Sequence, residues 1–172
     1  PADAAIGLDW VAPAFDDSSW REGTFGVGLE RSPNSARSFA PMIGTDVEEA
    51  MYRVNGSVYI RSTFNVADSS AIDSMVLGMQ YDDGFVLFLN GERILDANGP
   101  PPAELAWDSE ADASNPDTRA LEFEEFDLSE HTSLLRDGVN VLAIQGLNVS
   151  TSSNDFLVNP TLELIDLGPV NA

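Results

Sequence analysis

The chain has 172 residues, 43% hydrophobic and 22% charged, which is enough to bury the core of one globular domain. Its 29 acidic residues face eight basic ones, all arginine, and the net charge of −21 argues against nucleic acid and anionic membranes as partners. It has no cysteine and one histidine, which excludes disulfides, thiolate metal sites and multi-histidine metal sites.

Nothing in the sequence predicts membrane insertion or a leader. No apolar run approaches the ~20 residues that cross a bilayer. The opening residues 1–4 lack the basic and apolar regions of a signal peptide. We therefore expect a mature piece of a larger protein, with covalent neighbour domains. The cysteine-free, lysine-free and acidic composition fits a secreted bacterial module.

Short segments rich in β-branched and aromatic residues follow one another after residue 50. Their imperfect alternation of apolar and polar residues predicts strands. In chain order these segments are 58–66, 74–80, 84–89, 93–95, 121–128, 140–147 and 156–165. Asn90-Gly91 predicts a tight hairpin turn, because both residues tolerate positive φ. Residues 47–51 and 129–135 are expected to form one or two helical turns each.

Many short strands without alternating helices indicate an all-β protein, an antiparallel β-sandwich that occupies residues 1–172 as one domain. Residues 96–119 interrupt the pattern with three consecutive prolines, several acids and Trp107. A loop of this length inside a compact domain is usually functional or disordered.

Four motifs spread over nearly the full chain resemble those of a known family. They are Trp10 with the Phe-Asp-Asp-Ser-Ser-Trp segment 15–20 and glycines at 23–28, the aromatic-x-Arg-x-x-Phe segment 59–64, the Asp-Asp-Gly to Asn-Gly segment 81–91, and the Gly-x-Asn-x-Leu-Ala segment 138–144. Together they resemble galactose-binding-like jelly-roll modules, accessory domains of large secreted bacterial proteins. The resemblance implies a jelly-roll fold, carbohydrate binding and, in many members, a structural calcium ion.

The sequence departs from that family at two places. Arg93 and Asp96 stand where relatives often have Glu and Arg, a reversal of sign that preserves a pair. Leu147 stands where relatives often carry His, so any role of that histidine is absent.

Trp107 is the first candidate for glycan contact, since an indole in a polar loop is free to stack on the C–H face of a sugar. The alternative is that the loop folds back and Trp107 packs on the sandwich edge. Asp82 and Asp83 precede Gly84, which fits a tight loop, a cation site or acceptors for sugar hydroxyls. The full predicted ligand-binding set is Trp107, Asp82, Asp83, Arg93, Asn98 and Asn148.

Calcium (Ca²⁺) is the expected metal, because oxygen ligands are the only abundant kind here. In the resembling fold it often links an early segment to the last strand, which implies Asp9, Glu163 and Asp166 as ligands. Residues 108–117 offer oxygens at alternate positions but lack the glycine and glutamate of an EF-hand loop. A looser cation site there and a solvated acidic loop both stay open.

The sequence predicts a non-catalytic carbohydrate-binding module. Its charge favours a neutral polysaccharide or oligosaccharide as partner. A nucleophile elbow, a phosphate loop and a dinucleotide fingerprint are all absent from the sequence. The alternatives are a structural spacer or protein-interaction domain that binds no glycan, and a glycan-active enzyme.

Overall fold

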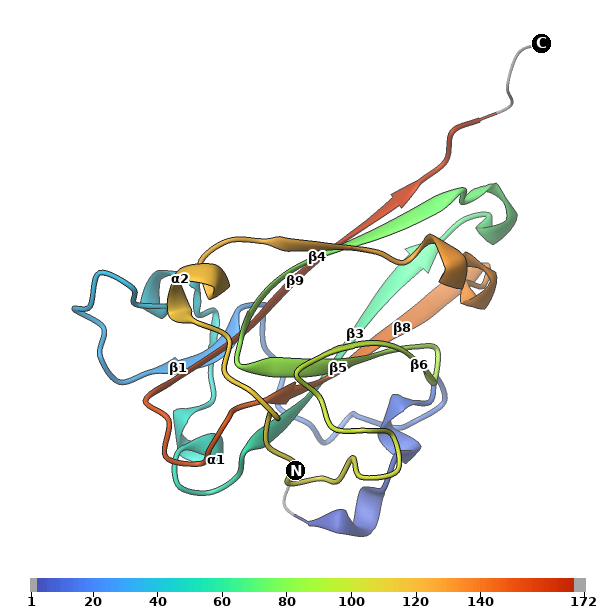
Figure 1. The fold of residues 1–172 in the computed structure, drawn as a ribbon. Helices are drawn as coiled ribbons and strands as arrows, with labels where there is room; N and C mark the ends of the chain where they lie inside the picture. The colour runs from blue at the N-terminus through green and yellow to red at the C-terminus, as the bar shows by residue number, and fades with distance from the viewer. Residues whose placement is uncertain (1–2, 169–172) are drawn as a thin grey trace.

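Two β-sheets packed face to face form the body of the molecule, a computed structural model that describes residues 3–168 (Figure 1). One sheet has five strands in the order β2-β1-β9-β4-β7, and the other has four in the order β3-β8-β5-β6. All pairs are antiparallel except β1 with β2. The predicted all-β antiparallel sandwich is confirmed, while Pro1 and Ala2 lie outside the described residues.

The strand bounds follow the predicted segments closely. The strands are β1 (Val27–Glu30), β2 (Thr45–Asp46), β3 (Ser57–Val66), β4 (Ser74–Asp82), β5 (Gly84–Leu89), β6 (Glu92–Ala97), β7 (Glu124–Asp127), β8 (Gly138–Leu147) and β9 (Asp155–Ile165). β7 is shorter than the predicted 121–128, because the first residues of that segment end a helical turn. β1 and β2 were not predicted.

Alternation along the strands gives each sheet an inner and an outer face. Leu77 and Met79 of β4 and Phe85 and Leu87 of β5 are fully buried in the core between the sheets. Residues one position along, such as Leu157 of β9, point to the outside and belong to separate apolar clusters. Both outer faces are therefore partly covered by loops.

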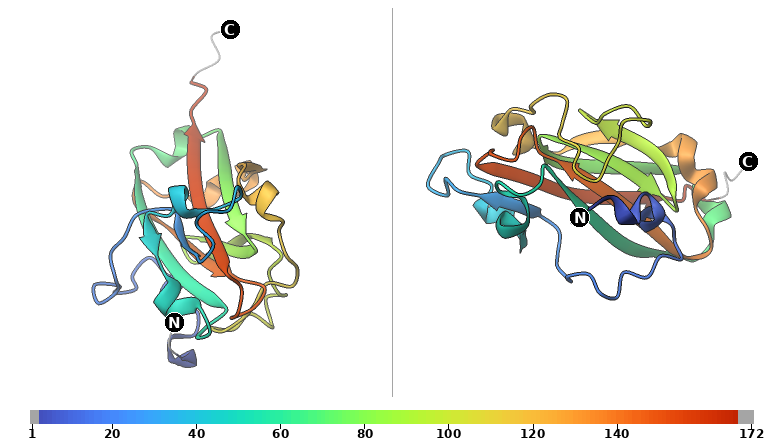
Figure 2. Two further views of the ribbon diagram at one scale, coloured as in Figure 1. Left: turned by 90° about the vertical axis from the view of Figure 1, so that its left-hand side faces the viewer. Right: turned by 90° about the horizontal axis from the view of Figure 1, so that it is seen from below.

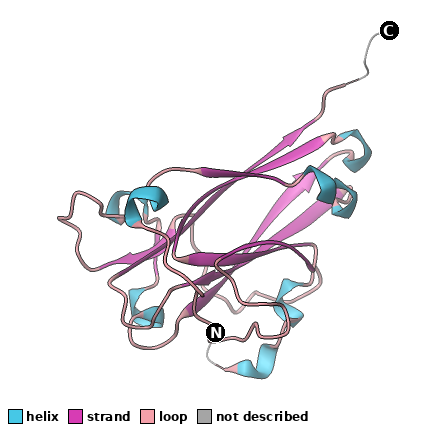
Figure 3. Cartoon of the chain, in the orientation of Figure 1, coloured by secondary structure: helices cyan, strands magenta, loops and turns pink. Residues whose placement is uncertain are grey.

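Helical structure is short and confined to connections, as Figure 3 shows. The helical turns are α1 (Glu48–Met51), α2 (Asp117–Ala120) and the 3-10 turns Ala4–Ile6, Asp9–Val11, Ala40–Met42, Ser69–Ala71 and Ser129–Leu134. The two predicted helical segments are confirmed by α1 and by the last of these turns. Within residues 3–168, no helix has the length and apolar character needed to traverse a lipid bilayer.

The N-terminal segment packs against the outside of the four-stranded sheet (Figure 2). Trp10 is fully buried there and stacks on Tyr59 of β3 with ring centroids 4.1 Å apart. The Arg61 guanidinium ties the segment down by donating to the main-chain oxygens of Trp10 and Ala12 and to Asp17 Oδ2 at 2.7 Å. Trp10 therefore has a structural role.

Residues 98–116 wrap around one end of the sandwich, from β6 of one sheet to α2 beside the other (Figure 1). The loop has no regular structure of its own, and main-chain bonds hold it in place. Ala111 N donates to Asn148 O and Asp112 N donates to Asn98 O, both at 2.9 Å. This end of the molecule carries the candidate sites.

Candidate functional site

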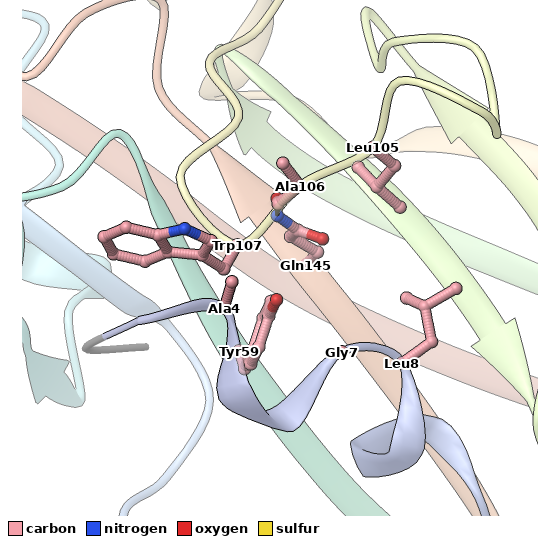
Figure 4. A pocket seen from close by; sticks show the side chains of 8 residues that line it. All are labelled: Ala4, Gly7, Leu8, Tyr59, Leu105, Ala106, Trp107 and Gln145. Carbon is pink, nitrogen blue, oxygen red and sulfur yellow. Dashed lines mark hydrogen bonds between the residues drawn. The ribbon is translucent and has the colours of Figure 1, made fainter.

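A shallow pocket of about 260 Å³ lies where the 98–116 loop meets the outer face of the four-stranded sheet. We call it the Trp107 pocket; Figure 4 shows its lining residues, which are Ala4, Gly7, Leu8, Tyr59, Leu105, Ala106, Trp107 and Gln145. Tyr59 comes from β3 and Gln145 from β8, where the two are direct cross-strand partners. Strand residues thus form the floor, and loop residues form the walls.

Trp107 is half-buried. The loop folds back onto the sandwich, as one interpretation of the sequence expected, and the indole still lines an open pocket. Its main-chain oxygen accepts hydrogen bonds from Ser57 Oγ at 2.6 Å and Asn55 Nδ2 at 3.3 Å. The residue is therefore anchored through its backbone, which leaves the side chain free to contact a ligand.

Gln145 is the buried polar residue of this pocket and was missed by the sequence interpretation. Its Nε2 donates to Ala106 O at 2.7 Å and to Ser57 Oγ at 3.3 Å. Its Oε1 is buried and has no hydrogen-bond partner among the described residues. The sequence does contain a signal for it, because Gln145 is a polar residue within the otherwise apolar segment 141–147.

The chemistry of the Trp107 pocket suits binding of an uncharged, partly apolar ligand. Its described lining holds aromatic, aliphatic and amide groups and no carboxylate, arginine or histidine. Hydrolysis of a glycosidic bond needs a pair of carboxyl groups across the bond. The lining therefore supplies surface for stacking and no acid or base for this reaction.

A second polar centre, which we call the Asp82 junction, lies where β4 passes into β5 and comprises Asp82, Asp83, Asn148 and Asp155. Asp83 accepts hydrogen bonds from Asn115 N at 3.1 Å on Oδ1 and from Val149 N at 2.8 Å on Oδ2. It thereby joins the 98–116 loop and the β8–β9 loop to the sheet. Asp83 is 4% exposed, so its carboxylate acts as an anchor rather than as a surface acceptor.

Asp82 lies on the outer face of the five-stranded sheet, opposite Leu157 of β9. It is 3% exposed, and its Oδ2 has no hydrogen-bond partner among the described residues. Burial, followed by the charges of Asp83, Asp155 and Asp117, raises the pKa of Asp82 to about 9. The neutral form of the Asp82 carboxyl group, hydrogen-bonded to the Asp83 side chain, is therefore favoured inside the protein.

Asn148 and Asp155 complete the junction from the far side. Asn148 is 3% exposed; its Nδ2 donates to Asp155 O at 2.8 Å, while its Oδ1 is buried without a partner in the described structure. Burial raises the pKa of the Asp155 carboxyl, with the charges of Asp117 and Glu30 acting in the same direction. The sequence interpretation named Asn148 and missed Asp155.

A polar cavity of about 340 Å³ adjoins Asp155. Its lining combines carboxylates, hydroxyl groups and a single arginine: Glu30, Ser32, Ser35, Arg37, Asp117, Ser152, Ser153, Asn154 and Asp155. The Glu30 carboxylate accepts hydrogen bonds from Ser32 N and Phe39 N. The four ion pairs found in residues 3–168 lie elsewhere.

The predicted ligand-binding residues do not gather in one site. Trp107 lines the pocket, whereas Asp82, Asp83 and Asn148 are buried at the junction. The remaining two serve other bonds: Asn98 Nδ2 donates to Asp83 O at 2.9 Å, and Arg93 pairs with Asp96 at 2.8 Å. The sign-reversed pair is thus present, and among the predicted ligand-binding residues Trp107 alone lines the Trp107 pocket.

The predicted calcium ligands are also apart from one another. Asp9 is exposed in a turn that packs on the four-stranded sheet, while Glu163 is exposed on β9 of the other sheet and Asp166 lies just beyond that strand. Within the described residues, no three acidic or histidine side chains are placed to hold an ion together. The register of β9 on β4 carries its last residues away from the N-terminal segment.

Comparison with known proteins gives matches at the level of structure alone. No family model and no curated protein sequence matches the chain. Part of a Bacteroides uniformis β-glucuronidase has a TM-score of 0.45 and 11% identity, covering 86% of this chain and 15% of that one. A glycosyl hydrolase family 2 member from Bacteroides cellulosilyticus has a TM-score of 0.44 and 14% identity. That match covers 87% of this chain and 18% of the hydrolase chain.

A Streptomyces avermitilis α-L-rhamnosidase gives a TM-score of 0.43 and 16% identity over 65% of this chain and 9% of its own. The chain thus spans less than a fifth of the length of each of these solved structures.

Proposed function

We propose that this protein is a non-catalytic carbohydrate-binding module that binds a neutral glycan at the Trp107 pocket, as part of a secreted bacterial protein. The observation that carries the proposal is a half-buried indole held by its own backbone beside Tyr59 in an open pocket without charged lining groups. Aromatic side chains offer large, rigid surfaces with an apolar body, which suits the C–H face of a pyranose ring.

The size of the pocket supports recognition of one sugar unit or of a chain lying across it. Its volume of about 260 Å³ is below the ~300–1,000 Å³ typical of sites that enclose a drug-sized ligand. The net charge of −21 disfavours polyanionic glycans. Neutral polysaccharides are therefore the first ligands to test.

The test compares glycan retention of the wild-type protein and Trp107→Ala. Affinity electrophoresis through gels containing neutral polysaccharides, and an oligosaccharide array, find the ligand; calorimetry then measures its Kd. Truncation of a central aromatic contact typically weakens binding on the order of 10- to 100-fold. We expect a loss in that range for Trp107→Ala, with an unchanged fold because the anchoring bonds use main-chain Trp107 O.

Phe123→Ala is the matched control, because Phe123 is a 47% exposed aromatic residue outside the pocket. It should leave glycan retention unchanged. A wild-type protein that binds no glycan on either assay contradicts the proposal and favours a spacer domain. Release of sugar products by the isolated chain would instead indicate a glycan-active enzyme.

A further inference from the structure

The floor of the Trp107 pocket contains a buried oxygen atom without a hydrogen-bond donor. Gln145, near the end of β8, is 0% exposed, and its Oε1 has no hydrogen-bond partner among residues 3–168. Figure 4 shows its side chain among the lining residues, with the amide nitrogen toward Ala106 and the oxygen on the other arm. Buried acceptors in native proteins nearly always have a donor, which comes from the chain, from water or from a ligand.

The direction of the Gln145 amide is fixed by the hydrogen bonds of its nitrogen. Nε2 donates to Ala106 O at 2.7 Å and to Ser57 Oγ at 3.3 Å. Ser57 Oγ uses its own proton to donate to Trp107 O at 2.6 Å, so it accepts from the amide. A flipped amide would set Oε1 against Ala106 O, two acceptors without a proton between them. Oε1 is therefore held as an acceptor at the floor of the pocket.

The groups around Gln145 are aromatic and aliphatic. Tyr59 is its direct partner on β3, and such cross-strand partners place their side chains next to each other on one face of the sheet. The walls of the pocket add Trp107, Leu105 and Leu8 (Figure 4). The described lining contains no charged side chain. A ligand group that suits this floor therefore combines a hydrogen-bond donor with an apolar surface.

An acetamido group has this combination, because its N–H donates and its methyl group is apolar. Its carbonyl oxygen is an acceptor, for which the lining offers the Tyr59 hydroxyl and the Trp107 indole N–H as donor groups. A hydroxyl group of an unmodified hexose also donates, but it brings no methyl group to the aliphatic walls. Its neighbouring hydroxyl groups would lose their water there without gaining partners. The lining thus favours an N-acetylated sugar over an unmodified hexose.

We propose that the Trp107 pocket selects N-acetylhexosamine units, with Gln145 Oε1 accepting a hydrogen bond from the acetamido N–H and the methyl group packing against Leu8 and Leu105. This assignment rests on the proposed function and adds the class of sugar to it. Because Gln145 is fully buried, the donor reaches Oε1 through a movement of the pocket wall. That wall is formed by the irregular 98–116 loop and the segment around the Ala4–Ile6 turn, surface segments of the kind that move within nanoseconds to microseconds.

The experiment measures by calorimetry the Kd of the wild-type protein for three matched ligands. They are the trimer of N-acetylglucosamine, the glucose trimer with the same linkage, and an ester analogue of the first in which oxygen replaces each acetamido N–H. We expect the acetamido trimer to bind about 10- to 100-fold more tightly than the ester analogue, which leaves Oε1 without a donor. It should bind about 10-fold more tightly than the glucose trimer, which lacks the methyl groups.

Gln145→Met keeps the length of the side chain and removes both amide functions, so the preference for the acetamido trimer over the ester analogue should disappear. Circular dichroism checks the fold of the variant, and the wild-type comparison of the two ligands tests Oε1 even if Gln145→Met does not fold. Gln80→Met is the matched control, because Gln80 is buried in β4 of the other sheet, where its Nε2 donates to Leu121 O. It should keep the preference.

The results distinguish the class of sugar from glycan binding itself. Equal or tighter binding of the glucose trimer or of the ester analogue overturns the selection of N-acetylhexosamine and leaves glycan binding in place. A preference retained in folded Gln145→Met overturns the role of Gln145. A wild-type protein that binds none of the three trimers and no glycan on the array contradicts the proposed function as well.

Discussion

Tyr81 connects the core to the edge of the five-stranded sheet through one hydroxyl group. Its ring packs edge-on against Phe85 with centroids 5.0 Å apart, and its hydroxyl donates to Glu124 Oε2 of β7 at 2.9 Å. Burial, then the hydrogen bond to Glu124 and the charge of that carboxylate, raises the pKa of Tyr81 to about 12. The folded state therefore favours the neutral phenol.

This shift makes stability depend on alkaline pH. The pKa of Tyr81 in the folded state exceeds the ordinary value of 10.0, so the stabilisation is complete below pH 10. It is lost as the pH rises from 10 toward 12, because the unfolded chain releases its proton first. We expect the free energy of unfolding, measured in urea, to fall over this range in the wild type and to fall less in Tyr81→Phe.

Tyr52→Phe is the control for this measurement, since Tyr52 lies outside the core, against Arg31 and Arg53. It should retain the wild-type dependence on pH. Burial also raises the pKa of Tyr59, so absorbance at alkaline pH should show late-ionising phenols in the folded wild type, one fewer of them in Tyr81→Phe. Identical slopes for Tyr81→Phe and the wild type would mean that neither burial nor Glu124 holds the phenol neutral.

Asp83 illustrates what residue identity alone does not determine. Adjacent acids before a glycine fit a tight loop, a cation site and a sugar-binding edge equally well from the sequence. Its bonds to Asn115 N and Val149 N cross 32 and 66 positions of the chain, so its role depends on where two distant loops arrive. The same holds for Gln145, whose importance depends on the path of the 98–116 loop.

The β5–β6 hairpin is the element that the sequence predicts best. Asn90 and Gly91 have φ of 52° and 100°, the left-handed values that the Asn-Gly pair predicted. The Asn90 side chain adds bonds that the turn itself does not require. Its Nδ2 donates to Leu134 O and Asn140 Oδ1, both at 2.8 Å, and its Oδ1 accepts from Val141 N at 2.9 Å.

Two substitutions of Asn90 distinguish how much the backbone turn and the side-chain hydrogen bonds each contribute to stability. Asn90→Ala loses the buried bonds and keeps a side chain at positive φ, so we expect the free energy of unfolding to fall by roughly 2–4 kcal/mol. Asn90→Gly loses the same bonds but relieves the backbone, and should be about 1 kcal/mol less destabilised. Urea unfolding of both variants measures the difference.

Asn154→Ala is the matched control, because Asn154 is exposed on the β8–β9 loop and should change stability by less than about 0.5 kcal/mol. Equal destabilisation of Asn90→Ala and Asn90→Gly would show that the backbone conformation contributes nothing. Wild-type stability in both would show that the network is dispensable.

Strands whose own sequence shows a clear apolar pattern were predicted. Strands that form only because another strand pairs with them were not predicted. β8 and β9 consist of long alternating or continuous apolar runs, which identify strands in isolation. β1 is short and contains Gly28, whose close approach to Phe156 O makes sense only once β9 lies alongside. β2 has two residues and exists only through its pairing with β1.

At the scale of the whole molecule, the pattern of short strands predicted the sandwich but not the location of the candidate sites. The sequence placed all ligand residues in one set, whereas the structure puts Trp107 in the pocket, Asp82, Asp83 and Asn148 at the junction, and Arg93 and Asn98 in other bonds. The division follows from the wrap of residues 98–116 around the end of both sheets, which no local pattern encodes. Long-range main-chain bonds, such as Ala111 N to Asn148 O, fix that path.

The net charge of −21 is a property of the whole molecule with its own consequence for stability. Four ion pairs among residues 3–168 leave most of the 29 acids without a cationic partner, so the folded surface repels itself. The unfolded chain carries similar charge at larger separations and is repelled less. Screening should therefore favour the folded state.

We expect Tm to rise when NaCl increases from about 0.01 M to about 0.1 M, because the Debye length falls from about 30 Å to about 10 Å. The measurement is made in EDTA, so that bound divalent ions do not contribute, and is repeated with tetramethylammonium chloride. Equal rises with both salts would identify screening as the cause. A Tm that stays constant or falls would mean that self-repulsion does not limit the stability of this acidic sandwich.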